Sequence, residues 1–268
     1  MNDLFSCSLI IATYNWPEAL QKCLESAFEQ QYQPIEILIA DDGSDERTAK
    51  LIAEMKTRSS VPLIHVWHPD EGFRLGEIRN KAISTAKGDY IIQIDGDILM
   101  ERHFIADHLR MAKKNTFLCG SRVLLQPALS KRLLGQASVR LHRRQLSLGY
   151  VLNSIRLPFA GKLLADVYKR NQPTALRGCN MSFWRTDLLA VNGYNADMKG
   201  WGREDAELAI RLINAGIRKR FLKFMAIAYH LYHPENSRDD KDYHDGLLQK
   251  TIDQRLCWTK NGIQTSEK

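Results

Sequence analysis

The 268-residue sequence predicts an α/β fold in which a mostly parallel central sheet is flanked by helices. Two observations indicate this fold. Between residues 8 and 94, short apolar runs alternate with segments whose apolar residues recur at helical spacing. The short runs are predominantly apolar, without the regular alternation of a sheet that has one face in water. Both faces of the predicted sheet are therefore expected to be buried.

The N-terminal elements follow one another in strand and helix order. Each predicted strand is a short apolar run rich in β-branched residues, and each predicted helix has apolar residues three or four positions apart. Ser44 or Asp45 is placed to cap the second helix. The predicted strands are residues 8–12, 35–40, 63–67 and 90–94, and the predicted helices are residues 17–30, 46–56 and 76–86.

The elements predicted beyond residue 100 are less regular. A basic stretch at 127–172 is expected to be helical in parts, and the last thirty or so residues give no clear pattern. The sequence holds no internal repeat that would indicate a repeat protein. The predicted helices are residues 102–113 and 204–215, and the predicted strands are residues 116–121, 177–184 and 220–230.

The positive charge of the chain is concentrated in the basic stretch 127–172. This stretch contains nine Lys or Arg residues and one acid, Asp166, whereas the net charge of the whole chain is +7. Such an excess favours an anionic partner. Leucine, valine and phenylalanine alternate with the cations, so the stretch could lie on an anionic membrane surface. A charged helix face packed on the core explains the pattern equally well.

The cysteine content and the first residues favour the cytoplasm. Five cysteines are an odd number, and they show no spacing typical of a disulfide framework or a zinc site. The N-terminus has Asp3 where a signal peptide would need a cation. No apolar run approaches the roughly 18 residues of a membrane-spanning helix. We therefore expect a cytoplasmic protein whose membrane contact, at the inner face of the plasma membrane, is peripheral.

Acidic residues follow two of the predicted strands. Asp95 and Asp97 end the fourth strand with Gly96 between them, and two carboxylates so spaced can turn toward one divalent cation. Asp41 and Asp42 end the second strand. In parallel sheets the loops at the carboxyl ends of the strands form the ligand site. An ordinary turn is the alternative in both places.

Other polar residues near these strand ends are suited to a nucleotide. Asp42 could accept a hydrogen bond from a base, and Tyr14 could stack on its ring. Arg79 could bind a phosphate with its two-pronged guanidinium. The alternative for Asp42 is a capping turn, that for Tyr14 is packing in the core, and that for Arg79 is a surface ion pair.

Four ordered motifs resemble the nucleotide-sugar half of glycosyltransferase family 2, which has the Rossmann-like GT-A fold. They are Ala-Thr-Tyr-Asn at 12–15, Asp-Asp-Gly-Ser at 41–44, Arg-Asn-Lys-Ala at 79–82 and Asp-Gly-Asp at 95–97. The resemblance implies that a base, ribose and diphosphate bind along these loops, and that the donor is a UDP-sugar. The donor-binding residues expected from it are Thr13, Tyr14, Asn15, Asp41, Asp42, Asp70, Arg79, Asp95, Gly96 and Trp201.

The segment Gly-Trp-Gly-Arg-Glu-Asp at 200–205 resembles the acceptor region of galactosyltransferases and chondroitin-polymerase-like enzymes. The resemblance implies that Glu204 and Asp205 are catalytic: they hold the acceptor sugar, and Asp205 takes the proton of its hydroxyl. A plain helix N-terminus is the alternative. Ala206 and Glu207 follow, where the galactosyltransferases continue with acids, so the acceptor stays open.

Two histidines, His230 and His233, follow the last predicted strand. Members of the family place a histidine here as a metal ligand, and we expect His230 to fill that role with His233 as the second choice. Mixed oxygen and imidazole ligands suit Mn²⁺ at least as well as Mg²⁺. The expected metal ligands are Asp95, Asp97, His230 and His233.

The sequence thus predicts one domain, 1–268, that performs inverting, metal-dependent transfer from a UDP-sugar to a hydroxyl of a glycan or lipid-linked acceptor. Its expected setting is bacterial surface polysaccharide or lipopolysaccharide synthesis. Residues 1–115 form the donor half, 116–235 the acceptor half and 236–268 the tail. A nucleotidyltransferase acting on sugar phosphates is an alternative, but its phosphate loop is missing. A nucleic-acid-binding module is another, but acids at the strand ends would repel a phosphate backbone.

Overall fold

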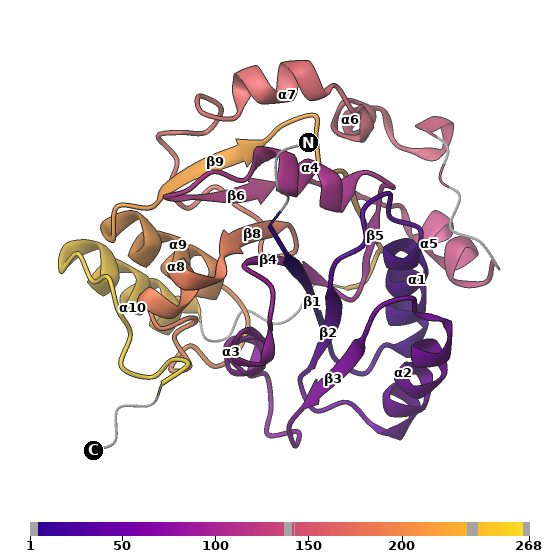
Figure 1. Ribbon diagram of the computed structural model, residues 1–268, viewed down its shortest axis with the longest axis horizontal. Coiled ribbons are helices and arrows are strands. Elements are labelled where there is room, and N and C mark those ends of the chain that lie inside the picture. Colours follow the sequence, from indigo (N-terminus) through magenta and orange to yellow (C-terminus); the bar gives the residue numbers. More distant parts are fainter. Residues whose placement is uncertain (1–4, 137–140, 142, 235–240, 265–268) are drawn as a thin grey trace.

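The computed structural model describes residues 5–136, 141, 143–234 and 241–264. Its larger sheet has seven strands in the order β3-β2-β1-β4-β8-β6-β9, and only β8 runs antiparallel to its neighbours (Figure 1). This confirms the predicted mostly parallel α/β sheet. The strands are β1 (Cys7–Thr13), β2 (Glu36–Asp41), β3 (Leu63–Trp67), β4 (Tyr90–Asp95), β6 (Thr116–Gly120), β8 (Met181–Trp184) and β9 (Arg218–Leu222).

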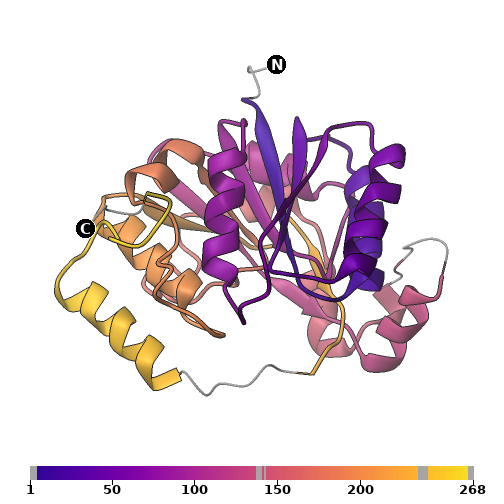
Figure 2. The ribbon, with the colours of Figure 1, turned by 90° about the horizontal axis from the view of Figure 1, so that it is seen from below.

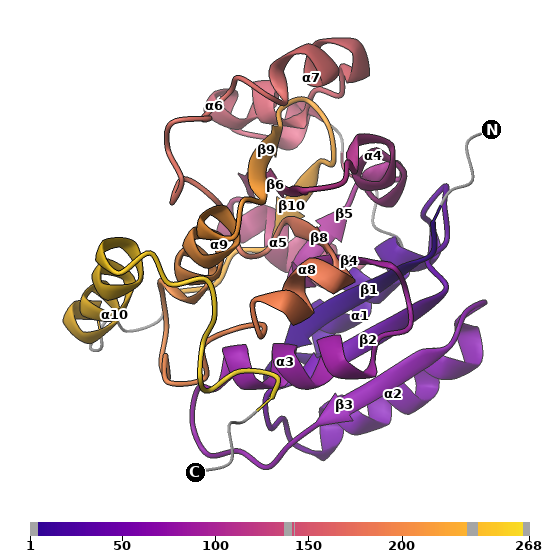
Figure 3. The same ribbon diagram turned by 60° about the vertical axis from the view of Figure 1, so that its left-hand side comes forward.

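Helices cover both faces of this sheet, as the apolar strands require (Figure 3). One face packs against α1 (Pro17–Phe28), α2 (Glu46–Arg58) and α4 (Phe104–Met111). The opposite face packs against α3 (Leu75–Thr85), α8 (Arg185–Ala190) and α9 (Glu204–Asn214). The side chain of Asp45 accepts a hydrogen bond from the Arg47 amide and so caps α2, one of the two caps expected.

A small second sheet joins distant parts of the chain. β10 (Ala228–His230) lies between β5 (Ile98–Met100) and β7 (Arg122–Leu124), antiparallel to β5 and parallel to β7. The register places His230 opposite Ile98, the residue that follows Asp97. This pairing brings the histidines at the end of β10 to the acids at the end of β4.

Two predicted strands are shorter in the structure than expected. The strand expected at 220–230 is two strands in different sheets, because the chain turns between them with Phe224 and Ala226 at positive φ. The strand expected at 177–184 begins only at Met181. Residues 177–180 form a turn closed by a hydrogen bond from the Asn180 amide to the Arg177 carbonyl.

The basic stretch folds as a series of short helices. These are α5 (Pro127–Leu134), α6 (Leu148–Val151) and α7 (Pro158–Leu164), with 3-10 turns at Arg143–Gln145 and Leu152–Ser154. Residues 137–140 and 142 of the stretch lie outside the described residues. Helix α10 (Lys241–Asp253), which the sequence did not reveal, lies at the edge of the molecule opposite α5 (Figure 2). Within the described residues, no helix is long and apolar enough to cross a membrane.

Candidate active site

The turn at residues 95–97 sends its two carboxylates in different directions. The Gly96 amide donates to the Ala12 carbonyl at 2.6 Å, and a Cβ at Gly96 would lie 3.1 Å from that oxygen. The close contact with β1 leaves little room for a side chain at this position. Asp95 pairs with Arg79 and Asp97 lies against the histidines, so the two carboxylates have different partners.

Asp97, His230 and His233 form a candidate metal centre. The Asp97 Oδ2 atom lies 3.4 Å from His230 Nε2 and 3.2 Å from His233 Nε2, and one ligand atom from each residue fits within 4.8 Å of the others. Asp97 Oδ1 is buried and has no hydrogen-bond partner among the described residues. Burial lowers the pKa of His230, which keeps that imidazole neutral as a metal ligand must be.

This donor set fits a divalent cation, and it brings both candidate histidines beside Asp97. It differs from the expected set in one respect. The carboxylate of Asp95 is not part of the cluster, since it pairs with Arg79. Mixed nitrogen and oxygen donors of this kind suit Mn²⁺ and leave room for Mg²⁺.

Arg79 connects the acids of the two halves of the chain. Its guanidinium is 1% exposed and donates to Asp95 Oδ1 at 2.8 Å and to Asp205 Oδ1 at 3.0 Å. Glu204 Oε1 lies 3.7 Å away. Burial acts to lower the pKa of Arg79, but the Asp205 carboxylate and its neighbours outweigh it, so the pKa is raised. The group expected at the donor phosphate is therefore enclosed by carboxylates.

The two acids at the start of α9 have different surroundings. Asp205 Oδ1 accepts from Arg79, and the Tyr194 hydroxyl lies 3.0 Å from the same oxygen. No described residue donates to Asp205 Oδ2. Glu204 is buried, and burial together with the Asp205 charge raises the pKa of Glu204 to about 8. Two acids with environments this different are suited to different roles, Asp205 as the partner of Arg79 and Glu204 as a neutral acid.

Backbone geometry fixes the position of Asp205. A Cβ at Gly178 would lie 1.7 Å from Asp205 Oδ2, so only glycine leaves space for this carboxylate. Gln93 on β4 donates to the Gly178 carbonyl at 2.9 Å and holds the turn in place. Gly200 and Gly202 have φ values of +91° and +109°, which glycine adopts without strain, and they shape the loop before α9.

The expected base-binding residues line the neighbouring loops. Tyr14 is half exposed and its hydroxyl donates to Asp70 at 2.9 Å. Asp42 is buried, and its carboxylate is hydrogen-bonded to the His68 ring at 2.6 Å and accepts from the Arg74 amide at 2.9 Å. These contacts hold Asp42 firmly and use part of its capacity to accept hydrogen bonds.

Three further predicted residues lie in or next to the loops after β1 and β2. Asp41 is fully buried and accepts from the Ser44 amide and from His65. Asn15 has a left-handed backbone; its amide donates to the Ser44 hydroxyl oxygen, and its side-chain oxygen accepts from the Asp45 amide. Thr13 is buried at the end of β1. These contacts join the loops after β1 and β2.

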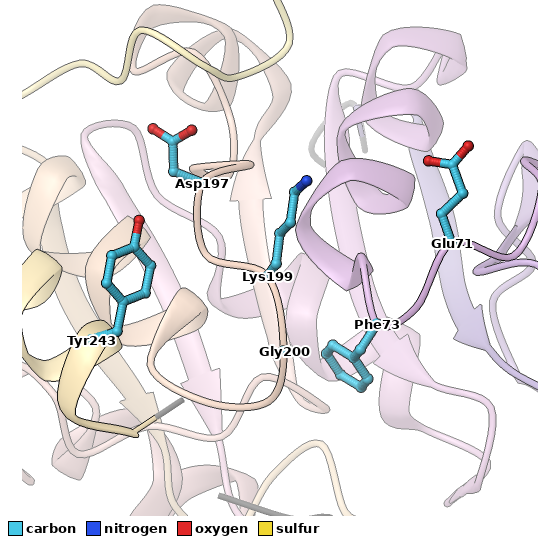
Figure 4. Close-up of a pocket in the computed structure, with 6 residues that line it drawn as sticks. All are labelled: Glu71, Phe73, Asp197, Lys199, Gly200 and Tyr243. Atoms are coloured by element: carbon cyan, nitrogen blue, oxygen red, sulfur yellow. The ribbon is translucent and has the colours of Figure 1, made fainter. Parts of the chain in front are cut away.

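An open groove of about 570 Å³ lies beside the loop that leads to Glu204 and Asp205 (Figure 4). Three segments contribute to it: the loop before α3, the loop before α9 and α10. Trp201, 38% exposed, follows the groove residue Gly200 in the chain. The lining residues are Glu71, Phe73, Asp197, Lys199, Gly200 and Tyr243.

Sequence reasoning missed several side chains that support the site. Tyr194 is fully buried between Gln93 and Asp205, and burial together with Asp205 raises its pKa well above the ordinary value. His68 is buried against Asp42. A polar residue inside an apolar strand, as Gln93 is, was the one available signal. The partners of Tyr194 and His68 lie too far away in the sequence to be read from spacing.

The fold is that of the GT-A glycosyltransferases, and in it a buried arginine joins acids from two distant parts of the chain. The chain belongs to glycosyl transferase family 2, whose model matches residues 8–164. The model of the N-terminal domain of galactosyltransferase matches residues 162–234. The members of this family transfer sugars, so the family match favours that reading over the nucleotidyltransferase and nucleic-acid-binding alternatives.

Two curated relatives show the range of similarity. The putative glycosyltransferase EpsH of Bacillus subtilis is 36% identical over 112 residues, which cover 41% of this chain and 31% of the relative. The chondroitin synthase of Pasteurella multocida is 23% identical over 273 residues, which cover 96% of this chain and 28% of the relative. The chain spans about a third of the length of these relatives.

Solved structures share the fold. The mannosyltransferase PcManGT of Pyrobaculum calidifontis, solved with GDP-mannose and Mn²⁺, has a TM-score of 0.63 at 18% identity, and the match covers 94% of this chain and 65% of that one. Residues 1–349 of TarS from S. aureus, solved with UDP, have a TM-score of 0.61 at 15% identity, and cover 91% and 64% of the two chains.

Proposed function

We propose that this enzyme moves a sugar, with inversion, from a UDP-sugar to a hydroxyl of a glycan or lipid-linked acceptor, and that it requires Mn²⁺ or Mg²⁺. The observation that supports this most directly is the shared guanidinium of Arg79. This one guanidinium donates to Asp95, from the proposed donor half 1–115, and to Asp205, from the proposed acceptor half 116–235. A donor and an acceptor bound in the two halves would meet there.

The donor end is the mouth bordered by Tyr14, Asp42, Asp70 and Asp97. Tyr14 offers an exposed ring for the base, and hydrogen bonds from His68 and the Arg74 amide fix the Asp42 carboxylate. A divalent cation held by Asp97, His230 and His233 would neutralise negative charge on the bound diphosphate and the further charge that develops on it as it leaves. The UDP and the GDP-mannose with Mn²⁺ in the two similar structures support a nucleotide-sugar donor and a metal.

The acceptor hydroxyl is activated by Asp205. As the hydroxyl oxygen attacks the anomeric carbon, the new C–O bond forms, the bond to the diphosphate breaks and its electron pair leaves with UDP. The hydroxyl proton passes to Asp205 Oδ2, because Oδ1 already accepts from Arg79. Arg79 is a positioning residue, since it contacts both acids and is itself buried.

The groove beside Asp205 is the proposed path of the acceptor. Phe73 and Tyr243 supply rings, and Glu71, Asp197 and Lys199 supply polar groups, a combination that suits a carbohydrate chain. The acidic and basic groups together do not favour a strongly charged acceptor. Trp201 is proposed to contact the sugars at the junction of donor and acceptor.

The proposed setting is the synthesis of bacterial surface polysaccharide or lipopolysaccharide, on the cytoplasmic side of the membrane. The names of relatives support a polysaccharide product: a chondroitin synthase and a hyaluronan synthase, both of Pasteurella multocida. These relatives are matched over only part of their length, so their own products do not define this one.

A panel of UDP-sugars, with GDP-mannose beside it, tests the proposal. The protein is incubated with each donor and Mn²⁺, and released nucleotide is measured with and without a chelator. We expect Mn²⁺-dependent hydrolysis of one or a few UDP-sugars. Turnover of GDP-mannose alone would contradict the UDP assignment, and turnover that the chelator leaves unchanged would contradict the metal requirement.

A further inference from the structure

The segment from α6 to α7 exposes an unusual number of large apolar side chains. Phe159 is 79% exposed and Leu148 is 91% exposed, more than any large apolar side chain outside this segment among the described residues. Large exposed apolar side chains gathered in one segment favour a contact with a membrane or a protein. We call these residues the apolar ridge: Leu148, Leu152, Leu157, Phe159, Leu163 and Val167.

The opposite side of α7 is anchored in the protein, which fixes the outward direction of the ridge. A Cβ at Gly161 would lie 2.7 Å from the Lys223 carbonyl, so this helix packs closely on the chain after β9. Ala165 is buried in the main core, and the Leu157 amide donates to the Phe224 carbonyl. Phe159 and Leu163 are one helical turn apart and therefore share the outward face.

The arrangement of the chain supports this direction. Both α6 and α7 form an outer layer at one edge of the molecule, beyond the central sheet (Figures 1 and 3). Leu148 and Leu152 are also one turn apart at the start of this layer. The ridge is thus presented along an edge of the molecule.

The charge around the ridge is positive. Lys162 and Arg170 are exposed and form no ion pair with a described residue. The one acid of the stretch, Asp166, is paired with Arg220 at 2.8 Å. Arg156 forms an ion pair with the buried Asp107. What remains on the surface is apolar side chains with uncompensated cations beside them.

We propose that the apolar ridge docks this enzyme on the surface of an anionic lipid bilayer. Apolar side chains would enter the boundary between head groups and acyl chains while Lys162 and Arg170 meet lipid phosphates. A protein partner is less consistent with this surface, because the centres of protein interfaces are depleted in lysine. The inference sharpens the expectation from the basic stretch: α5 contributes Leu129 and Leu133 to a buried core, and the exposed large apolar side chains of the stretch lie in its later part.

Vesicle flotation tests the inference. The full chain is mixed with phosphatidylcholine vesicles, with or without phosphatidylglycerol, and floated in a density gradient. We expect wild type to float with the anionic vesicles alone. The Phe159→Ser, Leu163→Ser double variant should bind at least about tenfold more weakly, since both apolar side chains are lost. Lys162→Glu should also weaken binding by about tenfold, because it reverses one charge.

Two matched variants serve as controls. Ile252→Ser removes an exposed apolar side chain from α10, and Lys50→Glu reverses an exposed charge on α2. Both should float as wild type does. Wild type that stays at the bottom with anionic vesicles, or a double variant that floats equally well, would overturn the inference. A wild-type dimer in sedimentation that the double variant dissociates would assign the ridge to a second copy instead.

The inference is independent of the proposed sugar transfer. Nucleotide release from the UDP-sugar in solution should be the same in wild type and in every ridge variant, because no ridge residue lies in the candidate site. Ridge-dependent flotation by a protein that hydrolyses no sugar nucleotide would contradict the proposed function and leave the membrane contact supported.

Discussion

The Arg79 guanidinium donates to Asp205 Oδ1 at 3.0 Å, although the two residues are 126 positions apart in the chain. The same group donates to Asp95 at 2.8 Å. Arg79 belongs to the region of the nucleotide-sugar motifs and Asp205 to the galactosyltransferase-like region, so their contact joins two sequence signatures into one site. A buried cation with three carboxylates near it is stable only as a set.

Replacing Arg79 by Met should therefore destabilise the protein substantially. The change leaves Asp95, Glu204 and Asp205 close together without their shared cation. Breaking a buried ion pair costs several kcal/mol, and since Asp95 is partly exposed we expect a loss of about 3 kcal/mol in the free energy of unfolding, measured in urea.

Arg47→Met is the matched control for Arg79→Met. Arg47 pairs with Asp45 at 3.0 Å, but both side chains are exposed, so its loss should cost under about 1 kcal/mol. Equal unfolding midpoints for the two variants would show that Arg79 does not hold the acids together.

Glu204→Gln should change how stability depends on pH. The pKa of Glu204 is raised to about 8 in the folded protein, so the folded state keeps a proton that the unfolded chain loses near pH 4.3. Wild type should therefore lose stability relative to Glu204→Gln as the pH rises from about 4.3 to about 8, by at least about 1.4 kcal/mol, the value of one pKa unit.

Urea unfolding of both proteins at intervals between pH 5 and pH 9 measures this difference. The gap between wild type and variant should widen up to about pH 8 and then stay constant. Parallel curves across the range would mean that Glu204 is ionised in the folded protein at neutral pH, and the division of roles with Asp205 would be wrong.

Gly178→Ala should impair transfer through its effect on Asp205. The added Cβ would lie 1.7 Å from Asp205 Oδ2, so the carboxylate must move. A displacement of about 1 Å at a reacting group can cost about 10²-fold in rate. UDP affinity, measured by calorimetry, should change little. Gly149→Ala is the control, since a Cβ there meets nothing within 4 Å and should leave the rate unaltered.

Asp205→Asn should separate chemistry from donor binding. An amide of the same shape cannot take the acceptor proton, so the transfer rate should fall by about 10² to 10⁴-fold while UDP binds as before. Asp245→Asn, which removes one carboxylate of an exposed pair with Arg203, should leave both unchanged. A parallel loss of UDP affinity and transfer in Asp205→Asn would rule out the assignment of Asp205 as the base.

Local pattern was enough to predict the framework of this fold. Apolar runs and helical spacing located β1 to β4 and the helices between them, because each element there buries a continuous apolar surface. The turn at Phe224 and Ala226 was missed, since positive φ at residues other than glycine leaves no clear mark in a sequence. The partly polar α10 was missed because it packs along only part of its surface.

The candidate site was predicted as a set of residues and not as a set of contacts. The positions of Asp95, Asp97, Asp205 and His230 near one mouth follow from strand ends and motif order. In the structure Asp95 pairs with Arg79, and only Asp97 of the two acids faces the histidines. This difference depends on how the small sheet packs against the end of β4. Such tertiary detail is not encoded in the spacing of single residues.

Asp97, His230 and His233 are proposed to hold a divalent cation on which donor cleavage depends. The most direct measurement is Mn²⁺ binding by calorimetry together with Mn²⁺-dependent UDP-sugar hydrolysis, in wild type, Asp97→Ala, and the control His103→Gln, whose histidine pairs with Glu101 away from the cluster. We predict that Asp97→Ala loses both Mn²⁺ binding and Mn²⁺-dependent hydrolysis, and that His103→Gln keeps both. An Asp97→Ala protein that still binds Mn²⁺ and hydrolyses the donor at the wild-type rate would contradict the account.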